Sequence, residues 1–252
     1  MRRLIRGAVR AFGFDVVRYR PHQGGPTLPE DLAVNDRSIL ERIAEYSMTS
    51  VERQAALVSA VRYLVRRNVK GCVVECGVWR GGSSMAVALA LLQENAADRD
   101  LYLFDTFEGM TPPTEVDRTA DGISAQTHLD NDISKTGYWC VAGIDDVRRN
   151  MTSTCYPESR VHLVKGPVET TIPEQSPAEP IALLRLDTDW YESTRHELIH
   201  LFPRLVEGGI LIVDDYGHWA GARKAVDEYL SELPDVYYLH RIDYTGRLLI
   251  KQ

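Results

Sequence analysis

Four aspartates in two short stretches of this chain have the spacing of a metal-assisted proton-transfer site. LLRLDTDWYEST, at 183–194, has Asp187 and Asp189 at the end of an apolar run, and GILIVDDY, at 209–216, has Asp214 and Asp215 at the end of another. Carboxylates that converge in a partly buried cleft repel one another unless a cation neutralises them. Hard oxygen ligands suit Mg²⁺. The sequence therefore predicts that Asp187, Asp214 and Asp215 bind Mg²⁺.

Asp189 is left for a different role. Two residues along an extended strand point the same way, so Asp187 and Asp189 are expected to face one cleft. A divalent ion lowers the pKa of a hydroxyl that it binds, which brings an alcohol within reach of a carboxylate base. We predict that Asp187 holds the metal and that Asp189 is the general base.

A glycine-rich turn indicates a cofactor site. ECGVWRGGSS, at 75–84, has glycines where a backbone can approach a ligand and hydroxyls where a helix begins. Asp105 ends the next predicted strand, where an acid can bind a ribose diol. The chain has no GxxxxGK[ST] phosphate loop, and the surroundings are acidic. These features favour a cationic nucleoside, S-adenosylmethionine, with Glu75 near its amino-acid end.

The segments that carry these residues alternate between strands and helices. Short apolar runs separated by amphipathic helices predict an α/β fold, an open doubly wound, mostly parallel sheet covered on both faces. The expected strands lie at 71–77, 101–105, 161–166, 181–187, 209–215, 236–240 and 246–252. The expected helices lie at 83–95, 144–151, 193–205 and 221–233, after two helices whose capping boxes begin at Ser38 and Thr49.

Three regions are expected along the chain. Residues 1–35 form a basic N-terminal helix and linker, 36–252 form the catalytic domain, and 106–140 form a lid loop over the site. Six arginines and one aspartate occur among the first 20 residues. Two interpretations of this segment remain open: an amphipathic helix on an anionic membrane surface, or a helix packed on the protein body or on a second subunit.

The composition limits the partners and the cellular location that are expected for this protein. The net charge of −7 argues against a nucleic-acid partner, because such proteins gather Lys and Arg on one face. No apolar run reaches the length of a membrane span. The four cysteines fit buried reduced thiols and a cytoplasmic protein. We also expect a homo-oligomer, with peripheral contact at the inner face of the membrane if the N-terminal helix binds lipid.

The motifs together resemble those of the macrocin O-methyltransferase (TylF-type) family. The resemblance rests on VVECGVWRGGSS, LFDTFEGM, LVKGPVETTIPE, LLRLDTDWYEST and LFPRLVEGGILIVDDYGHWAGARKAVDEY. It implies a class I methyltransferase with a seven-stranded sheet that depends on S-adenosylmethionine and Mg²⁺. It also implies the metal and base roles given above to the aspartates. The cofactor contacts that it implies are Glu75, Gly77, Gly81, Ser83 and Asp105, with Met48 and Arg53 from a covering segment.

The resemblance implies the type of reaction more directly than it implies the acceptor substrate. The expected acceptor is a sugar hydroxyl of a glycan, a glycolipid or a glycosylated natural product, with a vicinal diol chelated to the metal. The arginine-rich N-terminus departs from the antibiotic enzymes and looks more like the leaders of bacterial methyltransferases associated with surface glycans. Residues 106–140 have no residue-by-residue match to the family's substrate lid.

Three alternatives remain at this point. A catechol-type metal-dependent O-methyltransferase would act on an aromatic acceptor, but such enzymes carry Asp-Asn where this chain has Asp214 and Asp215. A haloacid-dehalogenase-type phosphatase would use DxDx[TV], whereas Tyr191 occupies the Thr/Val place. A non-catalytic glycan-binding protein would be expected to have lost some of the four aspartates.

Overall fold

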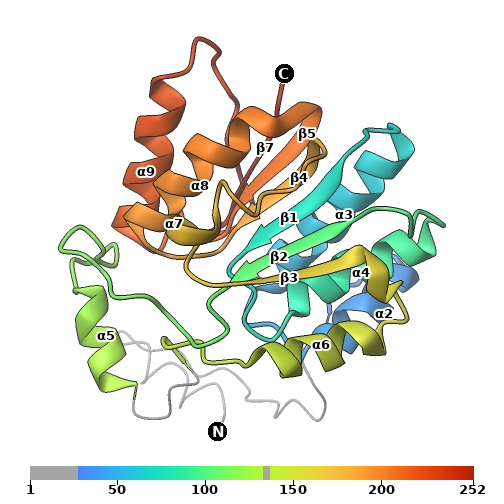
Figure 1. Ribbon diagram of the computed structural model, residues 1–252, viewed down its shortest axis with the longest axis horizontal. Coiled ribbons are helices and arrows are strands. Elements are labelled where there is room, and N and C mark those ends of the chain that lie inside the picture. Colours follow the sequence, from blue (N-terminus) through green and yellow to red (C-terminus); the bar gives the residue numbers. More distant parts are fainter. Residues whose placement is uncertain (1–27, 133–136) are drawn as a thin grey trace, which may run out of the picture. The chain divides into compact units, whose positions relative to one another are not determined.

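A seven-stranded sheet forms the centre of the protein. The computed structural model describes residues 28–132 and 137–252, and the compact unit that carries the sheet begins at Ala33. The strand order is β3-β2-β1-β4-β5-β7-β6 (Figure 1). β7 is antiparallel to β5 and to β6, and the other pairs are parallel. The predicted fold class is confirmed, and the predicted basic helix at the N-terminus lies outside the described residues.

The strands coincide with the apolar runs of the sequence, with one exception. Their bounds are β1 Cys72–Cys76, β2 Leu101–Asp105, β3 Val161–Lys165, β4 Ile181–Leu186, β5 Leu205–Val213, β6 His240–Arg241 and β7 Arg247–Ile250. The strand expected at 236–240 is wrong, since only its last residue enters β6. Val236 and Tyr238 are 91% and 80% exposed, whereas Tyr237 and Leu239 pack against the core. One side of this run is therefore partly buried, although it pairs with no neighbouring strand before His240.

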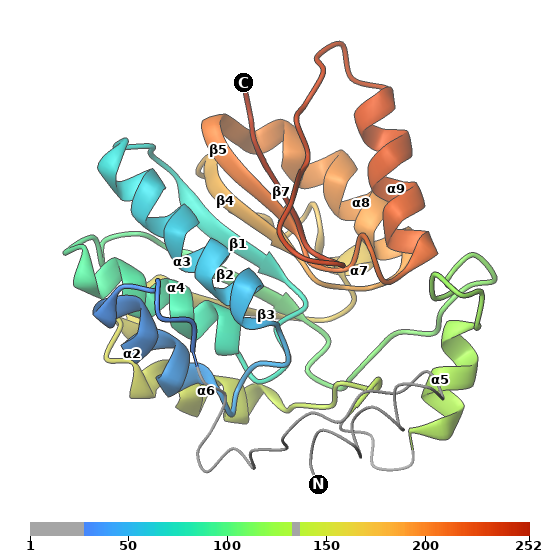
Figure 2. The ribbon, with the colours of Figure 1, turned by 180° about the vertical axis from the view of Figure 1, so that it is seen from behind.

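Helices cover both faces of the sheet (Figures 1 and 2). α2, α3, α4 and α6 pack together on one face, and α7, α8 and α9 lie on the other. The bounds are α2 Val34–Ile43, α3 Val51–Arg66, α4 Gly82–Gln93, α5 Ala125–Asn131, α6 Ile144–Ser153, α7 Val168–Thr171, α8 Tyr191–Leu201 and α9 Ala220–Ser231. α4 is buried from Gly82 to Leu91, which matches its nearly continuous apolar sequence.

Both predicted capping boxes are displaced. α2 begins four residues before Ser38, whose hydroxyl donates instead to the Asn35 carbonyl inside the helix. α3 is capped by Ser50, not Thr49, because the Ser50 hydroxyl accepts the Arg53 backbone N–H. The cap therefore fixes the start of the helix that delivers Arg53.

The segment predicted as a lid, 106–140, contains structure of its own. α5 lies within it, and Asp117 anchors it to the body of the protein. The fully buried Asp117 carboxylate accepts bonds from the Thr114 N–H and hydroxyl at 2.7 and 2.8 Å and from the Tyr191 N–H at 2.8 Å. Tyr191 is the first residue of α8. This half of the segment is thus fastened to the sheet-covering helices.

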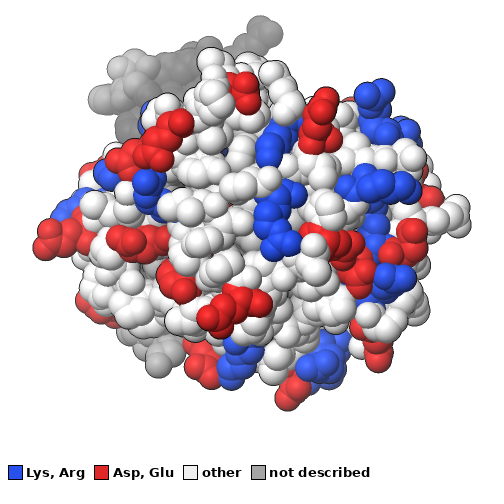
Figure 3. Space-filling view, turned by 45° about the horizontal axis from the view of Figure 1, so that its top comes forward, with Lys and Arg blue, Asp and Glu red and all other residues white. Residues whose placement is uncertain are grey.

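The surface mixes charges of both signs. Lys and Arg alternate with Asp and Glu on the face in Figure 3, without a continuous basic stripe there. No helix of the described part of the chain is long and apolar enough to cross a membrane. All four cysteines are free, and the expectation that they are all buried is wrong for Cys155, which is exposed in the turn after α6.

The Asp117 anchor yields a stability prediction. Asp117→Ala leaves the Thr114 and Tyr191 donors unpaired in the interior, so we expect the free energy of unfolding in urea to fall by about 1–3 kcal/mol. Limited proteolysis within 106–125 should become faster. Asp130→Ala, an exposed change in α5, is the control and should shift stability by less than about 0.5 kcal/mol. Equal stabilities of the two variants would contradict the anchoring role.

Candidate active site

A cavity of about 420 Å³ opens at the carboxyl ends of β1, β2, β4 and β5. This edge contains the switch point between β1 and β4, where ligands bind in open α/β sheets. Nine of the residues predicted from the sequence are on its wall: Met48, Arg53, Gly77, Ser83, Asp105, Asp187, Asp189, Asp214 and Asp215. Two are not, Glu75 and Gly81. Nine of the eleven predicted residues therefore lie on the wall of one cavity.

The three predicted metal ligands come together. Asp187 comes directly after β4, and Asp214 and Asp215 come directly after β5. Each offers one carboxylate oxygen, and these oxygens lie within 4.8 Å of one another. Asp214 and Asp215 are buried and Asp187 is half-buried at the cavity. This set of hard oxygen donors fits a divalent ion such as Mg²⁺.

Asp189 reaches the same cavity by a different route from the one expected. β4 ends at Leu186, so the alternation of an extended strand does not extend to Asp187 and Asp189. Asp189 instead adopts a left-handed backbone conformation with φ of +67°, which is uncommon outside glycine. Its N–H points to the Asp215 carboxylate at 3.3 Å. The turn brings the predicted base beside the predicted metal ligands.

Arg185 is the cation that sequence reasoning missed. It lies in β4 directly opposite Glu75 of β1, and its side chain is 3% exposed. Its guanidinium donates to Glu75 at 2.6 Å and bridges to Asp187 and Asp214, each at 2.8 Å. A lone arginine inside the apolar run IALLRL was the available signal, because a buried charge needs partners. Arg185 supplies part of the neutralisation that the sequence assigned to the metal alone.

Glu75 does not line the cavity but is buried behind it, where it has a structural role. It is buried, and besides Arg185 it accepts a bond from the Ser84 hydroxyl of α4. Glu75 therefore connects β1, β4 and α4 behind the site. The predicted contact with the cofactor's amino-acid end has no support from this position.

The carboxylates of the cluster have shifted pKa values. Burial raises the pKa of Asp189 to about 6, and the charge of Asp214 acts in the same direction. Burial also raises the pKa of Asp187, against the opposing charge of Arg185. The pKa of Asp215 lies well above its ordinary value, because burial and the charges of Asp189 and Asp187 disfavour its ionised form. A further cation in this cluster would be stabilised by all of these groups.

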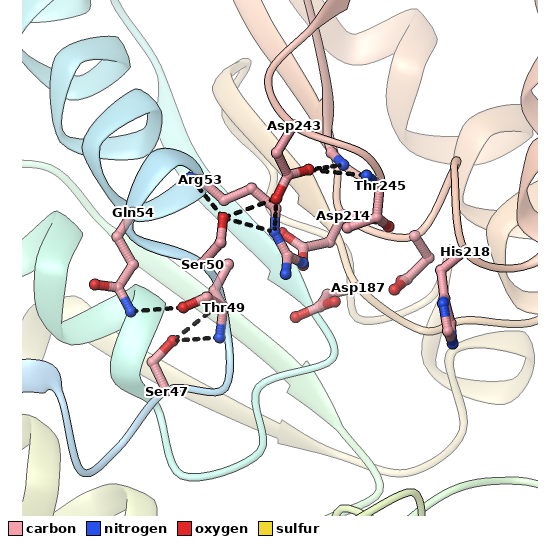
Figure 4. Close-up of polar contacts among 12 residues, drawn as sticks. Ser47, Thr49, Ser50, Arg53, Gln54, Asp187, Asp214, His218, Asp243 and Thr245 are labelled. Carbon is pink, nitrogen blue, oxygen red and sulfur yellow. Dashed lines mark hydrogen bonds and ion pairs between the residues drawn. The ribbon is translucent and has the colours of Figure 1, made fainter. Parts of the chain in front are cut away.

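Arg53 lines the cavity and is held from behind by Asp243, a residue from the far end of the chain (Figure 4). Arg53 pairs with Asp214, and its Nε donates to Asp243 at 3.0 Å. Asp243 also accepts from the Ser50 hydroxyl at 2.7 Å. Sequence reasoning missed Asp243, which lies in the β6–β7 turn far from any motif. Met48 is 52% exposed at the cavity rim.

The glycine-rich turn is shaped largely by the chain itself. Gly77 has φ of +81°, and a side chain there would collide with the Asp187 carbonyl. A side chain on Gly82 would collide with the Tyr46 carbonyl, which accepts the Gly82 N–H at 3.0 Å. Gly81 is the left-handed N-cap of α4 and lies off the wall, whereas Ser83 is on it. Gly77 thus permits close contact between the ends of β1 and β4, and Gly82 permits close contact between the start of α4 and Tyr46.

Asp105 organises this turn. Its carboxylate accepts the N–H groups of Val78 at 2.6 Å, Trp79 at 3.0 Å and Phe107 at 2.6 Å. Burial raises its pKa, against those three backbone bonds. Asp105 is on the cavity wall at the end of β2, which is the place expected for an acid that binds a ribose.

Aromatic side chains form the wall beside Asp215. Tyr138, His218 and Tyr244 line the cavity, and His218 packs edge-on against Trp219 with ring centres 4.7 Å apart. Burial lowers the pKa of His218, which favours the neutral ring. Trp190 is 2% exposed and donates to the Thr111 carbonyl, so it belongs to the core and not to the cavity wall.

Comparison with known proteins decides the family. A family model described as macrocin-O-methyltransferase (TylF) matches residues 35–250. This chain belongs to the macrocin-O-methyltransferase family. The resemblance drawn from the sequence motifs is confirmed, and the protein is an O-methyltransferase. Family membership decides against the phosphatase and the non-catalytic alternatives.

Relatives and solved structures agree with this assignment. Demethyldecarbamoylnovobiocin O-methyltransferase of Streptomyces niveus is 31% identical over 201 residues, covering 80% of this chain and 74% of the relative. Mycinamicin III 3''-O-methyltransferase of Micromonospora griseorubida is 32% identical over 184 residues, covering 73% and 70%. The structure of the O-methyltransferase NovP matches with a TM-score of 0.71 and 29% identity over 82% of each chain. The calicheamicin methyltransferase CalS11, at 20% identity and a TM-score of 0.60 over 92% of this chain and 99% of that chain, shares the fold.

Arg185→Met tests the buried ion network. The change leaves Glu75 in the interior without its cation and leaves Asp214 with Arg53 alone, and we expect the free energy of unfolding to fall by about 3–5 kcal/mol. Adding Glu75→Gln to the same protein should restore part of the loss. Lys224→Met, which breaks an exposed ion pair on α9, should leave the free energy of unfolding close to that of the unchanged protein. An Arg185→Met protein as stable as this control would refute the proposed network.

The pKa of Asp189 gives a pH prediction. Folded Asp189 keeps its proton up to about pH 6, whereas an unfolded aspartate loses it near pH 4. The folded state therefore binds more protons in between, and stability should fall as pH rises through this interval. In EDTA, from pH 5 to pH 8, we expect this fall to be about 1 kcal/mol smaller in Asp189→Asn than in the unchanged protein. Parallel curves from urea titrations would contradict the raised pKa.

Proposed function

We propose that this protein transfers a methyl group from S-adenosylmethionine to a hydroxyl of a sugar in a glycan, a glycolipid or a glycosylated natural product. The observation that supports it most is one cavity shared by the base candidate Asp189, three carboxylates suited to a divalent ion, and the Gly77–Ser83 turn with Asp105. One relative, 32% identical, is named as the 4'-O-methyltransferase of a dimethoxy-rhamnosyl tetracenomycin. A sugar acceptor is consistent with that name.

The cofactor would lie along the ends of β1 and β2. Ser83 at the start of α4 and Asp105 at the end of β2 offer polar groups on this part of the wall, and Met48 also lines the cavity. An acid-lined cavity suits a sulfonium cation better than a phosphate. S-adenosylmethionine, when bound, would supply an electrophilic methyl group.

The metal would be held by Asp187, Asp214 and Asp215, whose oxygens lie within 4.8 Å of one another. When bound there, Mg²⁺ would supply positive charge that lowers the pKa of a neighbouring acceptor hydroxyl. Arg185 holds Asp187 and Asp214 in place through one oxygen of each carboxylate. The protein thereby restricts the directions in which these side chains present their lone pairs.

Asp189 would accept the proton that the acceptor hydroxyl loses. With a pKa of about 6 its carboxylate is mostly ionised at neutral pH, yet it is basic enough to take a proton in the transition state. The left-handed backbone at Asp189 brings this residue beside Asp215, whose carboxylate accepts the Asp189 N–H. S-adenosylmethionine would supply the methyl group for the acceptor oxygen, and cleavage of its methyl–sulfur bond would release S-adenosylhomocysteine as the neutral leaving group.

The aromatic wall would orient the acceptor. Tyr138, His218 and Tyr244 line the cavity next to the carboxylates. A sugar ring has apolar C–H faces that pack on aromatic rings, and its hydroxyls remain directed to polar groups. Neutral His218 adds no positive charge to compete with a metal at this side.

Removal of the base tests the chemical step. Asp189→Asn keeps the shape of the side chain and abolishes its ability to take a proton, so we expect turnover to fall by about 10²–10⁴-fold. Binding of S-adenosylmethionine, measured by calorimetry, should stay within a few-fold of the unchanged protein. Near-normal turnover would remove Asp189 from the base role. Asp130→Ala, an exposed change outside the cavity wall, serves as the control.

The substrate class and the metal are tested in one assay. The protein is incubated with labelled S-adenosylmethionine, Mg²⁺ and a panel of rhamnosides, other glycosides and catechol, and the products are read by mass spectrometry. We expect a sugar to gain one methyl group and catechol to gain none. EDTA should abolish transfer and excess Mg²⁺ should restore it. Methyl transfer to catechol alone would favour an aromatic acceptor. Methyl transfer in the presence of EDTA would contradict the requirement for a metal.

A further inference from the structure

We propose that Arg53 is a resident counter-ion of Asp214 that a divalent ion has to displace, so that Arg53 sets the affinity of the site for metal. This inference rests on the proposed metal site and adds a positioning residue to it. It reassigns Arg53, which the sequence placed at the cofactor, to the neighbouring carboxylates.

Asp214 has a guanidinium on each of its oxygens. Oδ1 accepts a bond from Arg185 at 2.8 Å, and Oδ2 is in contact with Nη1 of Arg53. The Asp214 side chain is only 4% exposed, so water replaces neither partner. Asp214 is also one of the three carboxylates suited to an ion. A metal and Arg53 therefore compete for the same carboxylate.

The two arginines differ in their freedom to leave. Arg185 is in the middle of the sheet, 3% exposed, and is held on its other side by Glu75. Arg53 is in the first turn of α3, 14% exposed, and is part of the cavity wall. Figure 4 shows its guanidinium between α3 and the aspartates at the strand ends. Arg53 is thus the cation that can give way.

Asp243 holds Arg53 in this position independently of Asp214. Its carboxylate accepts the backbone N–H groups of Thr245 at 2.9 Å and Gly246 at 2.6 Å, and the same carboxylate accepts from Nε of Arg53. Arg53 can release Asp214 and keep this bond. The arrangement therefore provides one fixed contact and one exchangeable contact for the same side chain.

Electrostatics gives the direction of the effect. An ion that takes Asp214 has the Arg53 charge as its immediate neighbour, and like charges a few Å apart repel strongly in a partly buried site. Loss of the Arg53 charge should strengthen metal binding, even though it removes a bond from the folded protein. A purely structural arginine would have the opposite effect or none.

The test measures metal binding without cofactor or acceptor. The full-length protein is stripped with EDTA, and Mn²⁺ is titrated by calorimetry and by electron paramagnetic resonance of the free ion. The variants are Arg53→Met, which removes the charge, and Arg53→Lys, which keeps it. The matched control is Arg62→Met, because Arg62 is on the same helix, is equally exposed at 14%, and also pairs with two carboxylates, Asp36 and Glu94.

We expect Arg53→Met to bind Mn²⁺ about tenfold or more tightly, with Arg53→Lys and Arg62→Met close to the unchanged protein. Thermal unfolding gives a second readout. Mn²⁺ should raise the Tm of Arg53→Met more than the Tm of the other proteins, and this increase is expected even if the metal-free variant is less stable than they are. Unchanged or weaker Mn²⁺ binding by Arg53→Met would overturn the inference while leaving the metal site intact. Failure of every protein to bind Mn²⁺ would overturn the metal site, and the competition with it.

Discussion

The ion pair between Arg185 of β4 and Glu75 of β1 is the contact on which the site depends. These two residues face each other across the point where the strand order reverses, and both are buried. A charge in that position is tolerable only if its hydrogen-bonding groups are satisfied. Arg185 meets this condition by binding three carboxylates, Glu75, Asp187 and Asp214. The core of the sheet and the acidic edge are therefore parts of one network.

The chain geometry around this network is equally constrained. Gly77 permits the end of β1 to touch the backbone of Asp187, and Asp105 gathers the N–H groups of the next turn. The left-handed Asp189 then turns the chain back toward Asp215. Backbone conformations of this kind persist where the surroundings fix them, and they concentrate at functional sites. The rigid part of the site is thus its acidic centre, and the aromatic wall is assembled around it.

The features that could be predicted from the sequence are those that require only that the strands run parallel. Strands that end in Asp187 and in Asp214–Asp215 bring acids to one edge in any parallel sheet, so the acidic cluster was predictable. The partners of Arg185 were not, because they depend on which strand is its neighbour and in what register. Asp243 reaches Arg53 only because β7 returns antiparallel beside β5. Glu75 could be placed at a strand end, but whether it faced ligand or core depended on its buried partners.

The Asp117 anchor divides the segment predicted as a lid, 106–140, into two parts that should tolerate substitutions differently. Residues from Thr114 to Thr119 are fastened to α8 and to Trp219, whereas Tyr138 and Cys140 reach the cavity from the other end of the same segment. Trp139, between these two residues, packs on the cluster that contains Trp219, so it is tied to the anchored part. Exchanges at Tyr138 or Cys140 would alter the cavity wall at that end and leave the Asp117 bonds and the acidic centre in place. One fold can in this way be adapted to acceptors of different size through substitutions in one stretch of chain, while the residues of the acidic centre stay the same.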